Sequence, residues 1–230
     1  MKIKFLSVVA VLMFIFSLSV SAAGYEYSIS VGENFTEAKS GDDLTEISRK
    51  IGMSTDELNS YFSKNGLLYL AVSDDSKTQI RLSAFTDNYS SEVNDISHLN
   101  DEQLSDFMNS VSNDGENVCK TCVNNGRKYI TVESTHKDSG GVYTVTQYIT
   151  ICSGQTFYLS CYNDGESTSA EIQSAFNTFS LNGTSTEKGN GFGLTDAAII
   201  AGILIFTATA VIMVAGIIKS VRNKNASNDD

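Results

Sequence analysis

Residues 116–162 read ENVCKTCVNNGRKYITVESTHKDSGGVYTVTQYITICSGQTFYLSCY, and this stretch decides the fold. It contains three turn signals, Asn125-Gly126, Ser139-Gly140-Gly141 and Ser153-Gly154, each flanked by residues that favour strands. Turns this short join only antiparallel neighbours, because a parallel crossover needs many more residues. The stretch therefore predicts four consecutive antiparallel strands, at 116–123, 128–135, 142–152 and 155–162.

Shorter elements are expected on both sides of this meander. Alternating or continuous apolar residues and helix-start signals predict strands at 25–31, 35–39, 67–72 and 80–84, and helices that begin at Asp43, Ser54, Asn100 and Thr168. The first two strands are expected to form a hairpin that turns at Gly32. Arg81 and Ser83 alternate with apolar residues, so their strand is expected to be half exposed. The element order predicts an α+β domain with an antiparallel sheet.

Hydrophobic segments lie at both ends of the chain. Residues 1–23 carry early lysines, an apolar stretch and a small-residue exit, which is the order of a cleavable signal peptide. Ala197 to Ile218 contains no charged side chain and is long enough to cross a bilayer as a helix. The sequence therefore predicts a signal peptide at 1–23 and one transmembrane helix at 195–218.

The charges around the second segment predict its orientation. Lys219, Arg222 and Lys224 follow the segment, so the tail at 219–230 is expected in the cytoplasm and residues 24–182 form an extracytoplasmic domain. Residues 183–194 are expected to be a flexible stalk. The net charge of −11 disfavours nucleic acid as a partner. The expected location is therefore the cell membrane, with a single pass.

The segment IGMSTDELNSYFSKNGLLYLAV, at 51–72, resembles a stretch of PsbP-like secreted proteins. The polar turn that follows, Thr78-Gln-Ile-Arg-Leu and Leu99-x-x-Glu102-Gln-Leu104 extend the resemblance over most of residues 25–181. It implies an antiparallel sheet sandwiched by helices, in a module that binds or assists another protein without catalysis. No family site motif is present, so no functional residue is carried over.

A second resemblance covers a shorter part of the chain. Phe35 to Leu58 resembles the first two-thirds of a LysM peptidoglycan-binding repeat, with Gly41-Asp42 and Gly52 at the matching positions. The Gly-Gln-x-Leu that should close the repeat is missing, because Asn65-Gly66 leads directly into an apolar run. A LysM-like peptidoglycan-binding surface protein is the alternative function.

Four cysteines, Cys119, Cys122, Cys152 and Cys161, are candidates for disulfides in an oxidising compartment. The Cys119-x-x-Cys122 spacing allows a surface thiol-redox protein as a further alternative. These two cysteines lie on an expected strand, where side chains three apart point to opposite faces. The hairpin register places Cys119 opposite Val132 and makes a direct Cys152–Cys161 bond awkward, and the connectivity stays open.

The remaining candidates predict no chemistry. His98 and His136 are expected in solvated loops, without the partners of a catalytic triad, and no metal or cofactor site is expected. Four tyrosines, Tyr143, Tyr148, Tyr158 and Tyr162, are expected to pack under the final helix, with an exposed protein- or glycan-contacting face as the alternative. The sequence thus predicts a non-catalytic binding or accessory module whose partner is an envelope or surface protein.

Overall fold

The computed structural model describes residues 25–111, 118–138, 141–165 and 168–183. The strands are β1 (Tyr25–Ser28), β2 (Phe35–Lys39), β3 (Leu67–Ser73), β4 (Thr78–Phe85), β5 (Val118–Asn124), β6 (Arg127–Asp138), β7 (Gly141–Cys152), β8 (Gln155–Asp164) and β9 (Ser180–Gly183). The helices are α2 (Thr45–Ile51), α3 (Thr55–Lys64), α4 (Asn88–Val93), α5 (Asp101–Val111), α6 (Ala170–Thr178) and the short 3-10 helix η1 (Ile96–His98). The predicted α+β class is confirmed.

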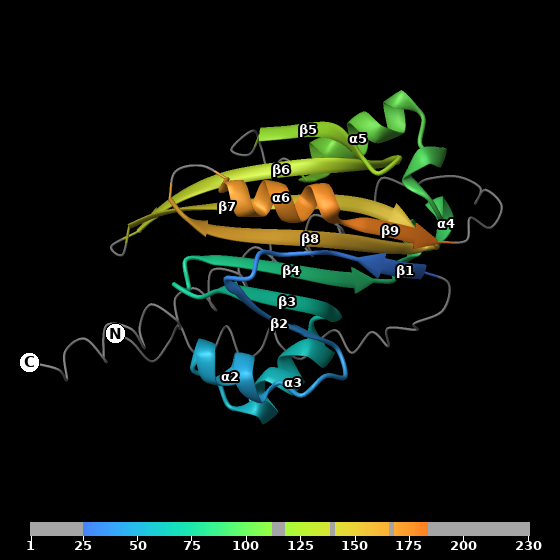
Figure 1. Ribbon diagram of the computed structural model, residues 1–230. Helices are drawn as coiled ribbons and strands as arrows, with labels where there is room; N and C mark the ends of the chain where they lie inside the picture. The colour runs from blue at the N-terminus through green and yellow to red at the C-terminus, as the bar shows by residue number, and fades with distance from the viewer. Residues whose placement is uncertain (1–24, 112–117, 139–140, 166–167, 184–230) are drawn as a thin grey trace, which may run out of the picture.

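Seven strands form one antiparallel sheet in the order β2-β3-β4-β8-β7-β6-β5 (Figure 1). The predicted meander forms its larger part, and two of its turns have the expected geometry. Asn125 and Gly126 both have positive φ, and so do Ser153 and Gly154, as a two-residue hairpin turn requires. The resulting register places Cys119 opposite Val132, as predicted.

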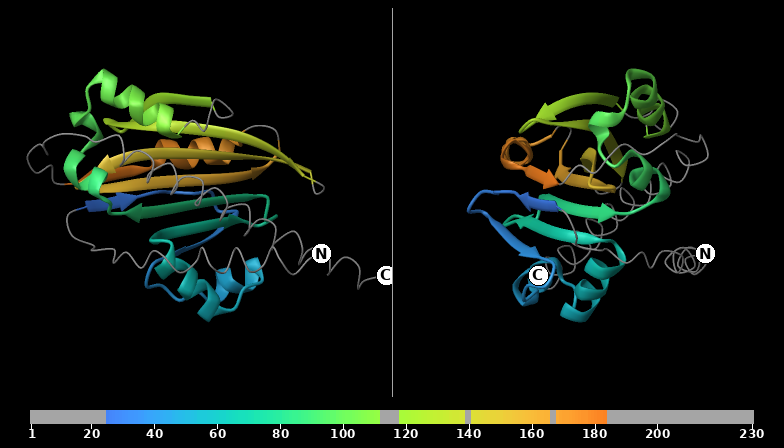
Figure 2. Two further views of the ribbon diagram at one scale, coloured as in Figure 1. Left: turned by 180° about the vertical axis from the view of Figure 1, so that it is seen from behind. Right: turned by 90° about the vertical axis from the view of Figure 1, so that its right-hand side faces the viewer.

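Helices cover both faces of this sheet. The front face, which is nearest the viewer in Figure 1, carries α6 and the small β1–β9 sheet over a core that includes Leu82, Leu159 and Phe179. The rear face carries α4, η1 and α5 over a second core around Phe107 and Tyr158 (Figure 2, left). A third core lies between α2, α3 and the strands β2 and β3.

The predicted hairpin between the first two strands is wrong. β1 pairs with β9, with Tyr25 opposite Gly183, whereas β2 pairs with β3. The cause is packing, because Tyr25 stacks edge-on against Phe157 at 4.7 Å and thereby holds β1 on the front core. The alternation at 25–31 identified a strand but not its partner, and the short polar β9 was not predicted.

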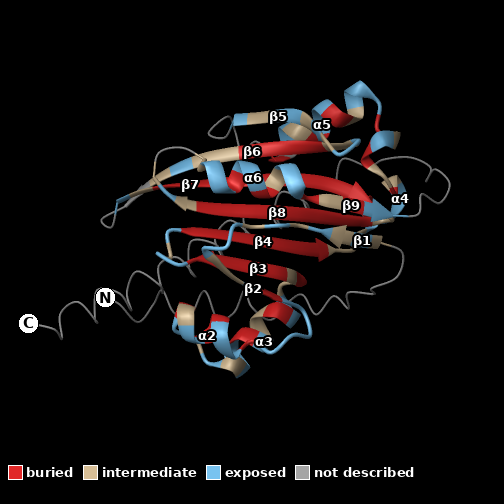
Figure 3. Ribbon diagram, viewed as in Figure 1, coloured by how far each residue is buried: buried red, intermediate tan, exposed pale blue. Residues whose placement is uncertain are grey.

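The predicted half exposure of β4 is also wrong. All of its residues except Phe85 are buried, including Arg81 and Ser83, because both faces of the central strands are covered (Figure 3). Alternation of polar and apolar side chains usually marks one face in water. Here the polar side chains lie on an enclosed rear face.

A partly buried ion pair joins the end of the domain to the rear helices. Arg127 Nη1 lies 2.8 Å from Asp95 Oδ2, and Arg127 Nε donates to the carbonyl of Leu181 in β9 at 3.1 Å. Burial alone would raise the pKa of the Asp95 carboxyl, but hydrogen bonds from Ser97 and Arg127 outweigh it and lower that pKa. The pair therefore favours charged Asp95 in the folded state.

Four predicted segments lie outside the described residues. These are the signal peptide at 1–23, the transmembrane helix at 195–218 and the tail at 219–230, together with the stalk beyond Gly183. Within the described residues, no helix combines the length and the apolar character needed to cross a membrane.

Candidate functional site

Polar side chains form a row across the middle of the rear face. Arg81 of β4 lies opposite Ser160 of β8, which in turn lies opposite Gln147 of β7. Gln79 precedes Arg81 by two residues on the same strand and therefore shares its face. We call Gln79, Arg81, Gln147 and Ser160 the rear polar row; each is buried.

Three members of the row have side-chain partners for hydrogen bonds or a cation–π contact. Gln147 Nε2 donates a hydrogen bond to Ser160 Oγ at 3.1 Å. The Arg81 guanidinium contacts the Tyr61 hydroxyl from α3, and its central carbon lies 5.6 Å from the Tyr61 ring centroid. The row is thus positioned by neighbouring strands and by a helix that packs beside it.

Gln79 differs from the rest of the row. Its side chain is 1% exposed, yet neither Nε2 nor Oε1 has a hydrogen-bond partner among the described residues. Gln79 is the one residue in the described part of the chain that has two separate buried polar side-chain atoms, both without a partner. An unsatisfied buried polar group costs about 1–3 kcal/mol, so its retention calls for an explanation.

Aromatic rings continue from Gln79 toward the end of the β6–β7 hairpin. Tyr162 lies opposite Gln79, its ring centroid is 5.3 Å from that of Tyr143, and Tyr143 stacks on His136 at 5.1 Å. We call His136, Tyr143 and Tyr162 the aromatic ladder. Together with the rear polar row it places flat rings, an amide and a cation on one enclosed face of the sheet, and these are groups that can stack and form hydrogen bonds.

The four predicted tyrosines therefore separate. Tyr148 packs on Phe176 of α6, with ring centroids 3.7 Å apart, as the expected packing under the final helix requires. Tyr158 lies in the rear core, and Tyr143 and Tyr162 lie in the aromatic ladder, so that expectation is wrong for these three. All four rings are buried.

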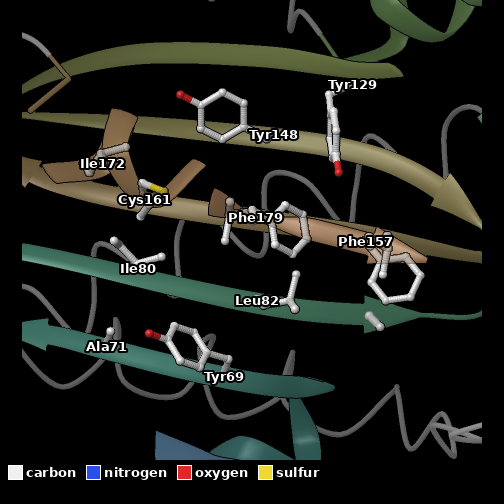
Figure 4. Packing of buried hydrophobic residues seen from close by; sticks show 14 of the residues in the cluster. Tyr69, Ala71, Ile80, Leu82, Tyr129, Tyr148, Phe157, Cys161, Ile172 and Phe179 are labelled. Atoms are coloured by element: carbon white, nitrogen blue, oxygen red, sulfur yellow. The ribbon is translucent and has the colours of Figure 1, made fainter. Parts of the chain in front are cut away.

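The cysteines do not form a common site in the described structure. Cys119 packs against the rear core and Cys122 against the front core, which confirms that they face opposite sides. All four thiols are free. In the strand register Cys152 lies opposite Gln155 beside the turn, whereas Cys161, labelled in Figure 4, lies opposite Thr146 far along the same hairpin. Burial raises the pKa of the Cys119 and Cys161 thiols, so neither is activated as a nucleophile. The predicted disulfides stay a prediction.

The histidines have structural partners. A ring nitrogen of His98 lies 3.1 Å from the carbonyl oxygen of Val93. His136 is in strand β6 and half buried, not in a loop as predicted, and its Nε2 lies 3.0 Å from Ser134 Oγ. No group of three or more potential metal-binding side chains occurs within the described ranges.

Sequence reasoning missed the rear polar row. The available signal was the strand Thr78–Phe85, where Gln79, Arg81 and Ser83 alternate with apolar residues. The alternation predicts that these three side chains share one face of the strand. Only the three-dimensional arrangement shows that this face is enclosed and that Gln79 is without a hydrogen-bond partner.

Comparison with known proteins does not identify a family. No family model and no curated protein matches the chain. A structure from Bacteroides thetaiotaomicron VPI-5482 is similar at 13% identity and a TM-score of 0.42, covering 72% of this chain and 50% of its own. The extracellular domain of PknH from Mycobacterium tuberculosis is similar at 8% identity and a TM-score of 0.20, covering 74% of this chain and 88% of its own. The chain thus spans half the length of the first relative, and neither likeness carries an argument about function.

Proposed function

We propose that this protein is a membrane-tethered, extracytoplasmic, PsbP-like binding or accessory module of the cell envelope that recognises an envelope or surface component without catalysis. The rear polar row and the aromatic ladder form its recognition site. Because these side chains are almost all buried, a ligand reaches Gln79 only when the layer that covers the rear face moves aside. The tether and the compartment rest on the apolar segments at 1–23 and 195–218.

The side-chain amide of Gln79 is the observation that carries this proposal. Both of its polar atoms lack partners although the residue is buried, so the fold retains a destabilising group. A ligand that presents one acceptor and one donor would satisfy both atoms at once. Water does not compete for hydrogen bonds in such an enclosed place, so hydrogen bonds formed there are stronger and favour specific recognition.

Site-specific photo-cross-linking tests the recognition site. The photoreactive residue p-benzoylphenylalanine replaces either Tyr162 on the rear face or Gln173, an exposed residue of α6 on the front face, in the full chain in the cells that make it. We expect one adduct of defined mass from the Tyr162 position and none from the Gln173 position. Equal labelling at both positions, or no adduct at the Tyr162 position, would contradict the proposal.

Carbonate extraction tests the tether independently. A chain held by a transmembrane helix is expected to stay with the membrane pellet at alkaline pH. Replacing residues 195–218 by a stop codon at position 195 is expected to release the protein into the medium. Release of the full chain by carbonate would contradict the proposed anchor and leave the recognition site as a separate question.

A specific observation favours peptidoglycan binding as a second candidate. Strands β2 and β3 pair with each other, and helices α2 and α3 between them share a separate core that includes Leu44, Ile47 and Leu58. This is a self-contained unit over the segment that resembles a LysM repeat. Retention of the protein on purified peptidoglycan, unaffected by Gln79→Leu, would support this candidate; absence of retention would remove it.

The thiol-redox alternative gains no support from the geometry. Cys119 and Cys122 point to opposite faces of β5, and burial raises the pKa of the Cys119 thiol. A redox pair needs two sulfur atoms in contact and a thiolate that forms easily.

A further inference from the structure

Strand β5 ends the seven-stranded sheet and pairs, among the described strands, with β6 alone. Its outer edge therefore presents backbone N–H and C=O groups that a further strand could pair with. Val118 and Val123 are 62% and 70% exposed, and they are the exposed large hydrophobic residues of the described part of the chain. At the opposite edge, β2 carries two exposed charges, Glu37 and Lys39, whereas β5 carries one, Lys120; charged side chains discourage such pairing.

Symmetry restricts how β5 could pair with a second copy of itself. In an antiparallel pair, residues directly opposite each other have side chains on the same face, and a two-fold axis must preserve that face. Because side chains alternate along a strand, the axis has to pass through a residue position and not between two residues. Only a few registers of Val118–Asn124 satisfy this condition.

One of these registers makes the strand complementary to itself. Thr121 is the middle residue of Val118–Asn124, so an axis at Thr121 pairs all seven residues. It places Thr121 opposite its own copy and Cys119 opposite Val123 of the second copy, twice over, on the rear face. An axis at Lys120 would instead bring two ammonium groups together, which is unfavourable.

We propose that two copies of this chain associate through antiparallel pairing of β5 centred on Thr121, which joins two seven-stranded sheets into one. We commit to a second copy because the two-fold axis at Thr121 pairs every residue of β5 and twice sets Cys119 opposite the exposed Val123. Pairing covers the exposed Val123 with an apolar side chain and satisfies the open edge. This interaction does not use the rear polar row, and its tests do not depend on the proposed function.

Cysteine cross-linking of the full-length chain in membranes tests the register. All variants carry Cys119→Ser. Thr121→Cys with Cys122→Ser is expected to give a disulfide-linked dimer under mild oxidation, because the paired Cα atoms would lie within disulfide range. The matched control, Lys120→Cys with Cys122→Ser, is expected to give little dimer. Lys120→Cys with Cys122 retained restores the opposing pair and is expected to cross-link.

The same cysteine variants can also overturn the proposal. Absence of dimer with Thr121→Cys, or equal dimer yields at positions 120 and 121 when Cys122 is replaced, would exclude the proposed register. Independently, Thr121→Glu places two carboxylates opposite each other and is expected to shift the light-scattering mass in detergent from dimer to monomer. Thr121→Val is expected to leave the dimer intact, and equal masses for both variants would overturn the proposal. Because Thr121 is exposed, circular dichroism should be unchanged in both.

Discussion

Replacing Gln79 with leucine tests whether its unpaired amide, which we assign to recognition, lowers the free energy of unfolding of the domain. The substitution keeps a side chain of similar size but removes an amide whose two polar atoms are buried and without partners. Val72 of β3 and Tyr162 of β8 lie opposite position 79, so a leucine there would meet largely apolar neighbours. We therefore expect the variant to be more stable than the natural protein.

The size of the effect follows from the desolvation penalty of the amide. Leaving a polar group buried and unsatisfied costs about 1–3 kcal/mol. Gln79→Leu is accordingly expected to raise the free energy of unfolding by about 1 kcal/mol or more. For a domain of this size, 1 kcal/mol corresponds to a rise in Tm of roughly 2–4 °C.

Urea unfolding followed by circular dichroism measures this difference, and two variants serve as controls. Gln147→Leu removes an amide that does donate, to Ser160, and is expected to lower the free energy of unfolding by about 1 kcal/mol. Gln173→Leu, at an exposed position of α6, is expected to change it by less than about 0.5 kcal/mol. If Gln79→Leu destabilises the protein as Gln147→Leu does, the amide has a partner within the chain and the reasoning is refuted.

Three further outcomes are expected. Because the pKa of Asp95 is lowered in the folded state, its carboxylate contributes fully to folding stability above the ordinary aspartate pKa of about 3.9. This contribution is lost as the pH falls through the folded-state pKa. Asp95→Asn should therefore lower the stability at pH 7 and flatten its decline between roughly pH 5 and pH 2 in urea titrations; an unchanged acid decline would contradict this assignment. Maleimide should label the half-buried Cys119 and Cys122 before the buried Cys152 and Cys161 in the reduced native protein, as peptide mapping would show, and equal rates would contradict the burial described. Phe179→Ala, which removes a ring that is 1% exposed in the front core, should cost about 3–5 kcal/mol, whereas a loss below about 1 kcal/mol would place α6 elsewhere.

Local signals predicted most of the strands and helices correctly. The Asn125-Gly126 and Ser153-Gly154 turns fixed the meander and its register, because two-residue turns allow little else. The same reasoning failed for β1, whose partner β9 lies at the other end of the domain. A pairing between strands so far apart in sequence is set by tertiary packing, here of Tyr25 on Phe157, and no local pattern encodes it.

The candidate site was less accessible to sequence reasoning than the fold. The alternation in Thr78–Phe85 predicts that Arg81 and Ser83 face solvent, because polar residues that alternate with apolar ones on a strand usually do. Their burial is a property of the assembled layers, as the contact of Arg81 with Tyr61 of α3 illustrates. The lack of a partner for Gln79 is likewise visible only in three dimensions.

Comparing photo-cross-linking from position 162 in the natural chain and in the Gln79→Leu variant, in the same cells, tests the central claim most directly. If the Gln79 amide completes the recognition site, the adduct formed by the natural chain should disappear in the variant, although the variant is folded and equally abundant. Survival of the same adduct at the same yield would show that recognition does not involve this amide.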